Sequence, residues 1–276
     1  MSEPILLPQH SASGLSLSRR CFRRIKSEIL QSDAAYRLYL KLKFGTGRPA
    51  VRPELPLPNG VLKSREEWQE ALAKAKADRL PLHRGGEKNW DHLAAVFAIL
   101  SSTTTSARVL DAGAEFYSNV LPALFAYGYR NLYGVNLSFT GPARRGPIQY
   151  LQGDITRTSF PDRYFDAVTC MSVIEHGVPL DGYFREMHRV LKPGGLLITS
   201  TDYYPTAINT EGKTAHGAPI KIFTKPEIQE ILRLADEIGF ESTGEVDLEC
   251  RERPVRWEQF GLEYSFVIFT LRKRTV

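Results

Sequence analysis

The stretch RVLDAGAEFYSN, Arg108 to Asn119, decides the fold of this 276-residue chain. A short apolar strand ends in Asp111, and one small residue and Gly113 follow it. A dinucleotide loop has further glycines in the pattern G-x-G-x-x-G, so that a pyrophosphate can approach the backbone. Glu115 and the aromatic residues after it break that pattern. Because an acid at the strand end would also repel a pyrophosphate, the loop suits a ligand that carries positive charge and no phosphate.

Apolar strands and helices alternate on both sides of this loop. We expect strands at 108–111, 131–136, 148–152, 165–171, 195–201, 245–249 and 264–272, and helices at 119–127, 180–190 and 225–238. Such alternation predicts a mostly parallel sheet that is covered by helices on both faces. The predicted fold is therefore α/β and Rossmann-like, with seven strands of which the last is antiparallel. Two Gly-Pro pairs between 137 and 149 predict a loop there, with one short turn at most.

A helical N-terminal extension precedes this domain. Residues 18–42 are expected to form a helix with Phe22, Ile25 and Ile29 on one face, and 44–60 to form an extended linker. Ser64 begins a second helix with a capping box, and a third runs from about 90 to 100. The predicted division is a flexible N-terminus (1–17), a helical extension and linker (18–86) and the main domain (87–276).

The positive charge of the chain belongs to its N-terminal part. The net charge is +5, and residues 1–50 alone hold nine Lys and Arg against three Asp and Glu. These residues form either a solvated helix face or a contact with an anionic membrane surface, a glycan or a nucleic acid. No run approaches the roughly 18 apolar residues of a membrane helix. Three scattered cysteines form no disulfide framework or metal cluster, which favours a reducing compartment such as the cytoplasm.

Ligands of an open parallel sheet bind at the carboxyl ends of its strands. The strand ends here carry Asp111 and Gly113, Asn136, Asp154, the segment 171–176 and the segment 201–204. S-adenosylmethionine has a sulfonium, an ammonium, a ribose and an adenine, and it has no phosphate. It is therefore the cofactor that these strand ends fit.

Four segments also resemble a known family. VLDAGAEF (109–116), LYGVNLS (132–138), GDITRTSFPDRYFDAVTCMSVIEHG (153–177) and MHRVLKPGGLLITSTDYYP (187–205) are together similar to class I S-adenosylmethionine-dependent methyltransferases of the methyltransferase 11 type. The resemblance covers about 90–276. It implies a cofactor site at Asp111, Gly113, Asn136, Ser138, Asp154, Ile155, Met171 and Ser172. Asn136 departs from the family pattern, in which an acid holds both ribose hydroxyls.

The side that receives the methyl group is less defined by the sequence. The candidates for substrate contacts are Trp90, Glu175, Tyr203, Tyr204 and Arg253, and the candidates for a general base are His176 and His216. Histidine suits a base because its ordinary pKa is about 6.5. Each of these residues could instead have a purely structural role: it could pack in the core, form a salt bridge or be exposed to solvent.

The expected function is methyl transfer to a hydroxyl group of a small molecule or glycan, by in-line displacement. Two alternatives stay open at this point. The chain could be a non-catalytic cofactor-binding partner subunit, or a nucleic-acid methyltransferase that uses its basic arm. Neither the acceptor nor the oligomeric state is determined by the sequence.

Overall fold

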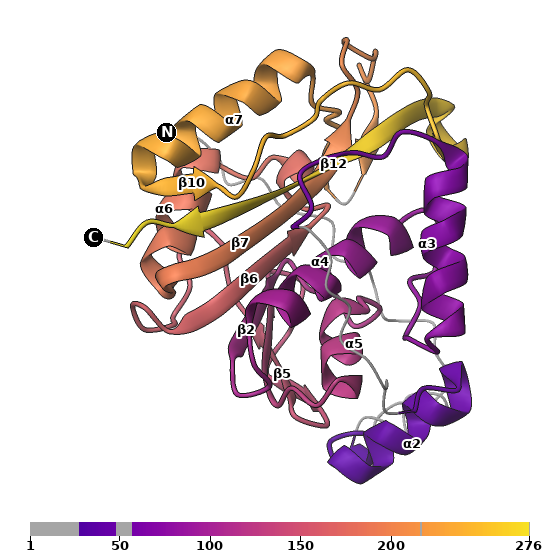
Figure 1. Cartoon of the computed structure of the whole chain (residues 1–276), viewed down its shortest axis with the longest axis vertical. Coiled ribbons are helices and arrows are strands. Elements are labelled where there is room, and N and C mark those ends of the chain that lie inside the picture. Colours follow the sequence, from indigo (N-terminus) through magenta and orange to yellow (C-terminus); the bar gives the residue numbers. More distant parts are fainter. Residues whose placement is uncertain (1–27, 48–56, 216, 276) are drawn as a thin grey trace, which may run out of the picture.

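A computed structural model describes residues 28–47, 57–215 and 217–275, and its centre is one large sheet (Figure 1). Along the sheet the strands are β4 (Ala143–Arg145), β5 (Ile148–Gln152), β3 (Asn131–Asn136), β2 (Arg108–Ala112), β6 (Phe165–Met171), β7 (Leu191–Tyr203), β12 (Leu262–Lys273) and β1 (Gly60–Val61). From β5 to β7 neighbouring strands are parallel, and β12 is antiparallel to β7. The prediction of a mostly parallel Rossmann-like sheet with an antiparallel last strand is confirmed.

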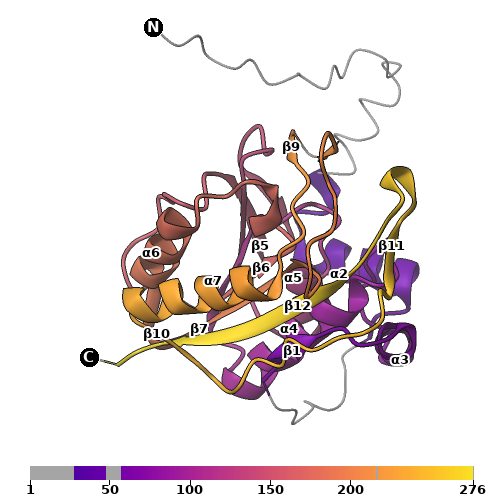
Figure 2. The same ribbon diagram turned by 90° about the horizontal axis from the view of Figure 1, so that it is seen from above.

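Helices cover both faces of this sheet. α4 (Asn89–Ser102) and α5 (Val120–Ala126) pack on one face, and α6 (Leu180–Val190) and α7 (Lys225–Ile238) pack on the other, as Figure 2 shows from above. Val109 and Leu110 are adjacent in β2 and both fully buried, yet they belong to the cores on opposite faces. Successive side chains of a strand point to opposite faces, so a strand buried on both sides must be apolar throughout.

The N-terminal extension is integrated into the domain. The short strand β1 pairs antiparallel with β12, where Val61 lies opposite Val267. α3 (Arg65–Ala77) lies beside α4, and its first turn is capped by Ser64, which accepts a hydrogen bond from the Glu67 backbone N–H. The Glu67 carboxylate accepts from the N–H of Lys63. The cap is therefore present, with the return bond shifted one residue from the predicted capping box.

Three predictions at the edges of the fold are wrong. The sheet has ten strands rather than seven, because short strands add to it at both edges. The predicted strand 245–249 is not a strand; β10 (Phe240–Ser242) and β11 (Val255–Trp257) pair with β12 instead. The predicted loop after β3 contains β4, which is antiparallel to β5.

The predicted helix 18–42 also differs in its described part. α2 begins only at Asp33 and ends at Phe44, and Ile29 before it is 58% exposed. Ile29 is therefore not on a packed face, while Phe22 and Ile25 lie outside the described residues, as does the segment 1–17. The apolar spacing predicted a helix in this region, but tertiary packing determines that Tyr36 and Leu40, rather than Ile29, contact the domain.

Candidate active site

The candidate site lies where the strand order reverses. β2 has β3 on one side and β6 on the other, and all three run parallel. Asp111 in β2 is 3% exposed, and its Oδ1 accepts a 2.8 Å hydrogen bond from Thr169 Oγ1 of β6. Burial raises its pKa to about 6, although the Thr169 bond lowers it. A nearby cationic ligand would favour the ionised form of this carboxyl group.

Gly113 turns the chain out of β2. Its φ is +87°, and its N–H donates to the Val135 carbonyl with a distance of 2.8 Å. A Cβ atom at this position would lie 2.3 Å from Val173 Cγ2, which is closer than real Cβ contacts. Glycine is therefore required here both by the left-handed backbone and by the close approach of the segment after β6.

Asn136, at the end of β3, holds the loop that follows β2. Its side-chain amide donates to the carbonyls of Gly113 (3.1 Å) and Ala114 (3.0 Å) and to Glu115 Oε1 (3.3 Å). Ser138 donates from its Oγ to the same Glu115 oxygen at 2.9 Å, and from its N–H to Asn136 Oδ1 at 2.8 Å. Glu115 thus brings a carboxylate next to Asn136, although it was not among the cofactor residues expected from the sequence.

The other predicted cofactor residues lie at the same edge of the sheet. Asp154 follows β5 and is exposed, and its Oδ1 accepts from the N–H and the hydroxyl of Thr156, both at 2.8 Å. Ile155 beside it is buried. Met171 ends β6 half-buried, and Ser172 follows with φ +54°. The turn at Asp154 is tied to the site because the Gly153 N–H donates to the Asn136 carbonyl at 3.2 Å.

Lys88 places a positive charge in the site, at the start of α4. Its Nζ donates to Ser172 Oγ at 2.5 Å, lies 3.4 Å from Asp202 Oδ1 of β7, and is 3.7 Å from the centre of the Phe266 ring. Burial alone would lower the pKa of Lys88, but the acids around it, Asp202 first, raise the pKa instead. The ammonium therefore stays charged.

Three buried acids surround this lysine. Asp91 is fully buried and accepts from Ser200 Oγ at 2.6 Å, while Glu175 is 2% exposed and accepts from Thr201 Oγ1 at 2.9 Å. Burial, and then the Asp202 charge, raises the pKa of Glu175 to about 8, and burial raises that of Asp202. The carboxyl groups outnumber the lysine, and one with a raised pKa could ionise beside a further cation. Asp91 and Lys88 were not predicted from the sequence, and Asp202 was included only within the strand-end segment 201–204. The signal for Asp91 was a polar first turn, NWDH, on an otherwise apolar helix.

The residues predicted to contact the methyl acceptor do not all lie together. Tyr203 is fully buried, and its hydroxyl donates to the Leu248 carbonyl at 2.6 Å, so the structure places it in the core. Tyr204 and Arg253 come together, with the guanidinium carbon 4.4 Å from the ring centre. Trp90 is half-buried between two cores. His176 is half-buried at the end of the short helix η1 (Ile174–His176), directly after Glu175. His216 lies outside the described residues.

The residues present fit S-adenosylmethionine. The Glu115 carboxylate lies at the strand end expected for a ribose, and the buried acids provide the surroundings that a sulfonium and an ammonium need. None of the described residues forms a group of three or more His, Cys, Asp or Glu side chains that could hold a metal ion. The fold and the residues at its strand ends are those expected of a class I methyltransferase domain.

Comparison with known proteins gives the same class. Residues 110–199 match the family model described as a methyltransferase domain, Methyltransf_11. The chain is 31% identical over 118 residues to sterol 24-C-methyltransferase erg-4 of Neurospora crassa, covering 41% of this chain and 31% of that protein. The sterol 24-C-methyltransferase of Debaryomyces hansenii is 28% identical over 119 residues, with 40% and 31% covered. The chain therefore spans about a third of the length of these relatives.

A solved structure supports the fold. The crystal structure of the [4+2]-cyclase SpnF superposes with a TM-score of 0.50 at 16% identity, and the match covers 80% of this chain and all of that one. Over residues 110–199 the chain therefore resembles S-adenosylmethionine-dependent methyltransferases.

Proposed function

We propose that the whole protein transfers a methyl group from S-adenosylmethionine to a small-molecule acceptor. The observation that carries the proposal is the group of buried acids around Lys88 at the strand ends. A buried carboxyl group with a raised pKa is costly to ionise, and a bound cation would favour its ionised form, so these acids suit a cationic cofactor. The two free cysteines among the described residues, Cys170 and Cys250, support a cytoplasmic location.

The cofactor site is proposed from residues of four strand ends. Those that would hold the cofactor are Asp111, Gly113, Glu115, Asn136, Ser138, Asp154, Ile155, Met171 and Ser172. When bound, S-adenosylmethionine supplies an electrophilic methyl group. The chain itself has to orient the acceptor and exclude water, and alignment of this kind can contribute about 7–11 kcal/mol.

The acceptor group that we favour is a hydroxyl of a small molecule or glycan. His176 would take its proton, because it follows β6 and the fixed Glu175 in a short helix that ends at Gly177. Tyr204 and Arg253, which stack on each other, would contact the body of the acceptor together with Trp90. His216, which lies outside the described residues, is the other base expected from the sequence.

A second candidate is transfer to a carbon atom of an apolar acceptor. It is favoured by the names of the relatives, which methylate a sterol at carbon 24. The matched segment spans the cofactor half of the domain, which does not by itself determine the acceptor.

Isotope-labelled S-adenosylmethionine tests both candidates. The full chain is incubated with a pool of hydroxylated small molecules and glycans and, separately, with a pool of sterols, and the position of the label is read by mass spectrometry. We expect oxygen-bound label from the first pool. Carbon-bound label from the sterols would select the second candidate, and cofactor binding without a product from either pool would contradict both.

A further inference from the structure

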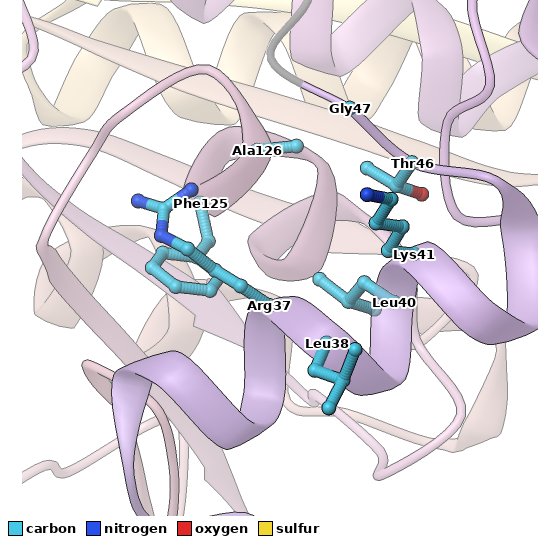
Figure 3. Close-up of a pocket in the computed structure, with 8 residues that line it drawn as sticks. All are labelled: Arg37, Leu38, Leu40, Lys41, Thr46, Gly47, Phe125 and Ala126. Atoms are coloured by element: carbon cyan, nitrogen blue, oxygen red, sulfur yellow. The ribbon is translucent and has the colours of Figure 1, made fainter.

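A pocket lies between α2 and α5, away from the carboxyl ends of the strands (Figure 3). It has a volume of about 300 Å³, at the lower end of the range for small-molecule sites. Its α5 wall is Phe125 and Ala126, in the last turn of the helix, just before β3 begins at Asn131. The candidate active site is at the other end of β3, about 16 Å further along the strand. The pocket therefore belongs to a different end of the sheet.

The pocket is fixed in shape by the packing of α2. Tyr36 is 2% exposed and stacks on Phe125, with 5.7 Å between ring centres. Asp33 forms an ion pair with Arg130, and the Gly146 N–H donates to the Leu30 carbonyl at 2.8 Å. These contacts attach the N-terminal end of α2 to the domain, and Leu40, 2% exposed, packs further along the same helix, so the space beside it is a preformed feature of the fold.

The lining combines apolar walls with positive charge. Leu38 and Leu40 of α2 face the pocket together with Phe125, and Arg37 lies over the Phe125 ring with 4.1 Å from its guanidinium carbon to the ring centre. Lys41 also lines the pocket, and within the described part of the chain it has no acidic partner. The lining residues that the structure describes include no Asp or Glu. An apolar cavity with two cationic side chains is complementary to an anion that carries an apolar chain.

A buried hydroxyl group points to a ligand independently. Gly45 ends α2 with φ +70°, and the chain then turns back so that Thr46 lines the pocket at 7% exposure. Thr46 Oγ1 is buried and has no hydrogen-bond partner among the residues that the structure describes. Buried polar groups of this kind are rare unless a ligand or water completes them. An anionic oxygen next to Lys41 would accept the hydrogen bond that Thr46 can donate.

We propose that this pocket binds a single-chain anionic amphiphile, with its acidic headgroup at Lys41 and Thr46 and its apolar chain along Leu38, Leu40 and Phe125. The volume suits one chain rather than two. The exposed Leu38 and Leu42, at 56% and 78%, continue the apolar surface out of the pocket. The inference does not depend on the methyl acceptor or on the reaction at the strand ends.

Calorimetric titration of the full chain with three twelve-carbon amphiphiles below their micelle concentrations tests the proposal. Dodecanoate is expected to bind, and dodecanol and dodecyltrimethylammonium to bind at least about tenfold more weakly, because they lack the charge that Lys41 attracts. Equal binding of the cationic amphiphile would overturn the proposal. So would binding to vesicles containing phosphatidylglycerol without binding of free dodecanoate, since α2 would then be a membrane-docking surface.

Three variants distinguish a built site from general attraction to a basic helix. Lys41→Gln should weaken dodecanoate binding by about tenfold, and the isosteric Thr46→Val by a few-fold, because each loses a hydrogen bond to a charged group. Lys43→Gln removes the same charge from the same helix, but Lys43 does not line the pocket and contacts Phe44 instead. The affinity of the Lys43→Gln variant for dodecanoate should stay within about twofold of that of the natural protein. Equal losses in the Lys41 and Lys43 variants would refute the site.

Discussion

The Glu115 carboxylate accepts a hydrogen bond from the Asn136 side-chain amide, with 3.3 Å between Oε1 and Nδ2. The loop after β2 thereby brings an acid to the end of β3, where the sequence has an amide. The Asn136 amide also donates to the carbonyls of Gly113 and Ala114 and so holds the loop in place. Glu115 is therefore the group that could accept hydrogen bonds from a ribose.

Glu115→Gln should therefore weaken S-adenosylhomocysteine binding by about tenfold, since a hydrogen bond to a charged acceptor is lost. Asn136→Asp should weaken it too, because a carboxylate there cannot donate to Gly113 and Ala114 and would repel Glu115. Titration calorimetry measures both. The control Glu241→Gln, on the exposed strand β10, should bind normally. An unchanged affinity of Glu115→Gln would remove the residue from the cofactor site.

Gly113→Ala should destabilise the protein by about 3 kcal/mol or more, because it adds a clash with Val173 to a left-handed backbone. Gly212 is a matched control, since its φ is +71° and nothing lies within 4 Å of its Cβ position. Gly212→Ala should therefore cost only the backbone strain, about 1–2 kcal/mol. Denaturant unfolding measures the difference, and the second substitution Val173→Ala should recover part of the loss. Equal costs at both glycines would contradict the packing argument.

Glu175→Gln should flatten the pH dependence of stability. The pKa of Glu175 is raised from 4.5 to about 8, first by burial and then by Asp202, so the folded state binds more protons than the unfolded state in this window. Stability then falls as pH rises from about 5 to 8, by up to about 1.4 kcal/mol per unit. The variant should gain stability over the natural protein at pH 8 and lose this gain at pH 5.

Glu186 provides the control of opposite sign. Burial alone would raise its pKa, but hydrogen bonds from Arg189 and Thr158 outweigh burial and lower the pKa. Its stabilisation is present above the unfolded pKa of about 4.3 and is lost as pH falls through the folded value. Glu186→Gln should therefore be most destabilising near neutral pH. The same direction of change in both variants would show that the pH effect does not come from these carboxyl groups.

Lys88→Met should cost about 3–5 kcal/mol at pH 8, because it leaves Asp202 and its acidic neighbours buried without a cation. Lys192→Met removes a partner of Asp166 from a partly exposed ion pair, with side chains 38% and 28% exposed. Its cost should be about 1 kcal/mol or less. S-adenosylmethionine should recover more stability in Lys88→Met than in Lys192→Met. A Lys88→Met protein as stable as the control would contradict the charge balance described for the site.

His176→Ala should lower kcat by about 10²-fold with little change in cofactor affinity, if the acceptor is a hydroxyl group. Steady-state kinetics measures kcat, with the acceptor that the isotope-labelling experiment identifies. Near-normal kcat would remove His176 as the base. His188→Ala, on α6 and packed against Phe240, is the control for losing a half-buried histidine elsewhere in the domain.

The sequence by itself determined the central elements. The bounds of β3, β5, β6, α6 and α7 were predicted to the residue, because apolar spacing and turn residues are local signals. The sequence alone also predicted that Asp111, Gly113 and Asn136 lie at one edge of the sheet, since the carboxyl ends of parallel strands meet there.

Tertiary structure alone decided the charges around that site. Lys88 and Asp91 come from the helix before β2, and Asp202 from β7, so only the packing of α4 over the sheet brings them together and buries them. The same holds for β1 and β12, which pair across more than 200 residues. Long-range strand pairing and burial depend on which distant segments pack together, and a local sequence pattern does not determine which segments do so.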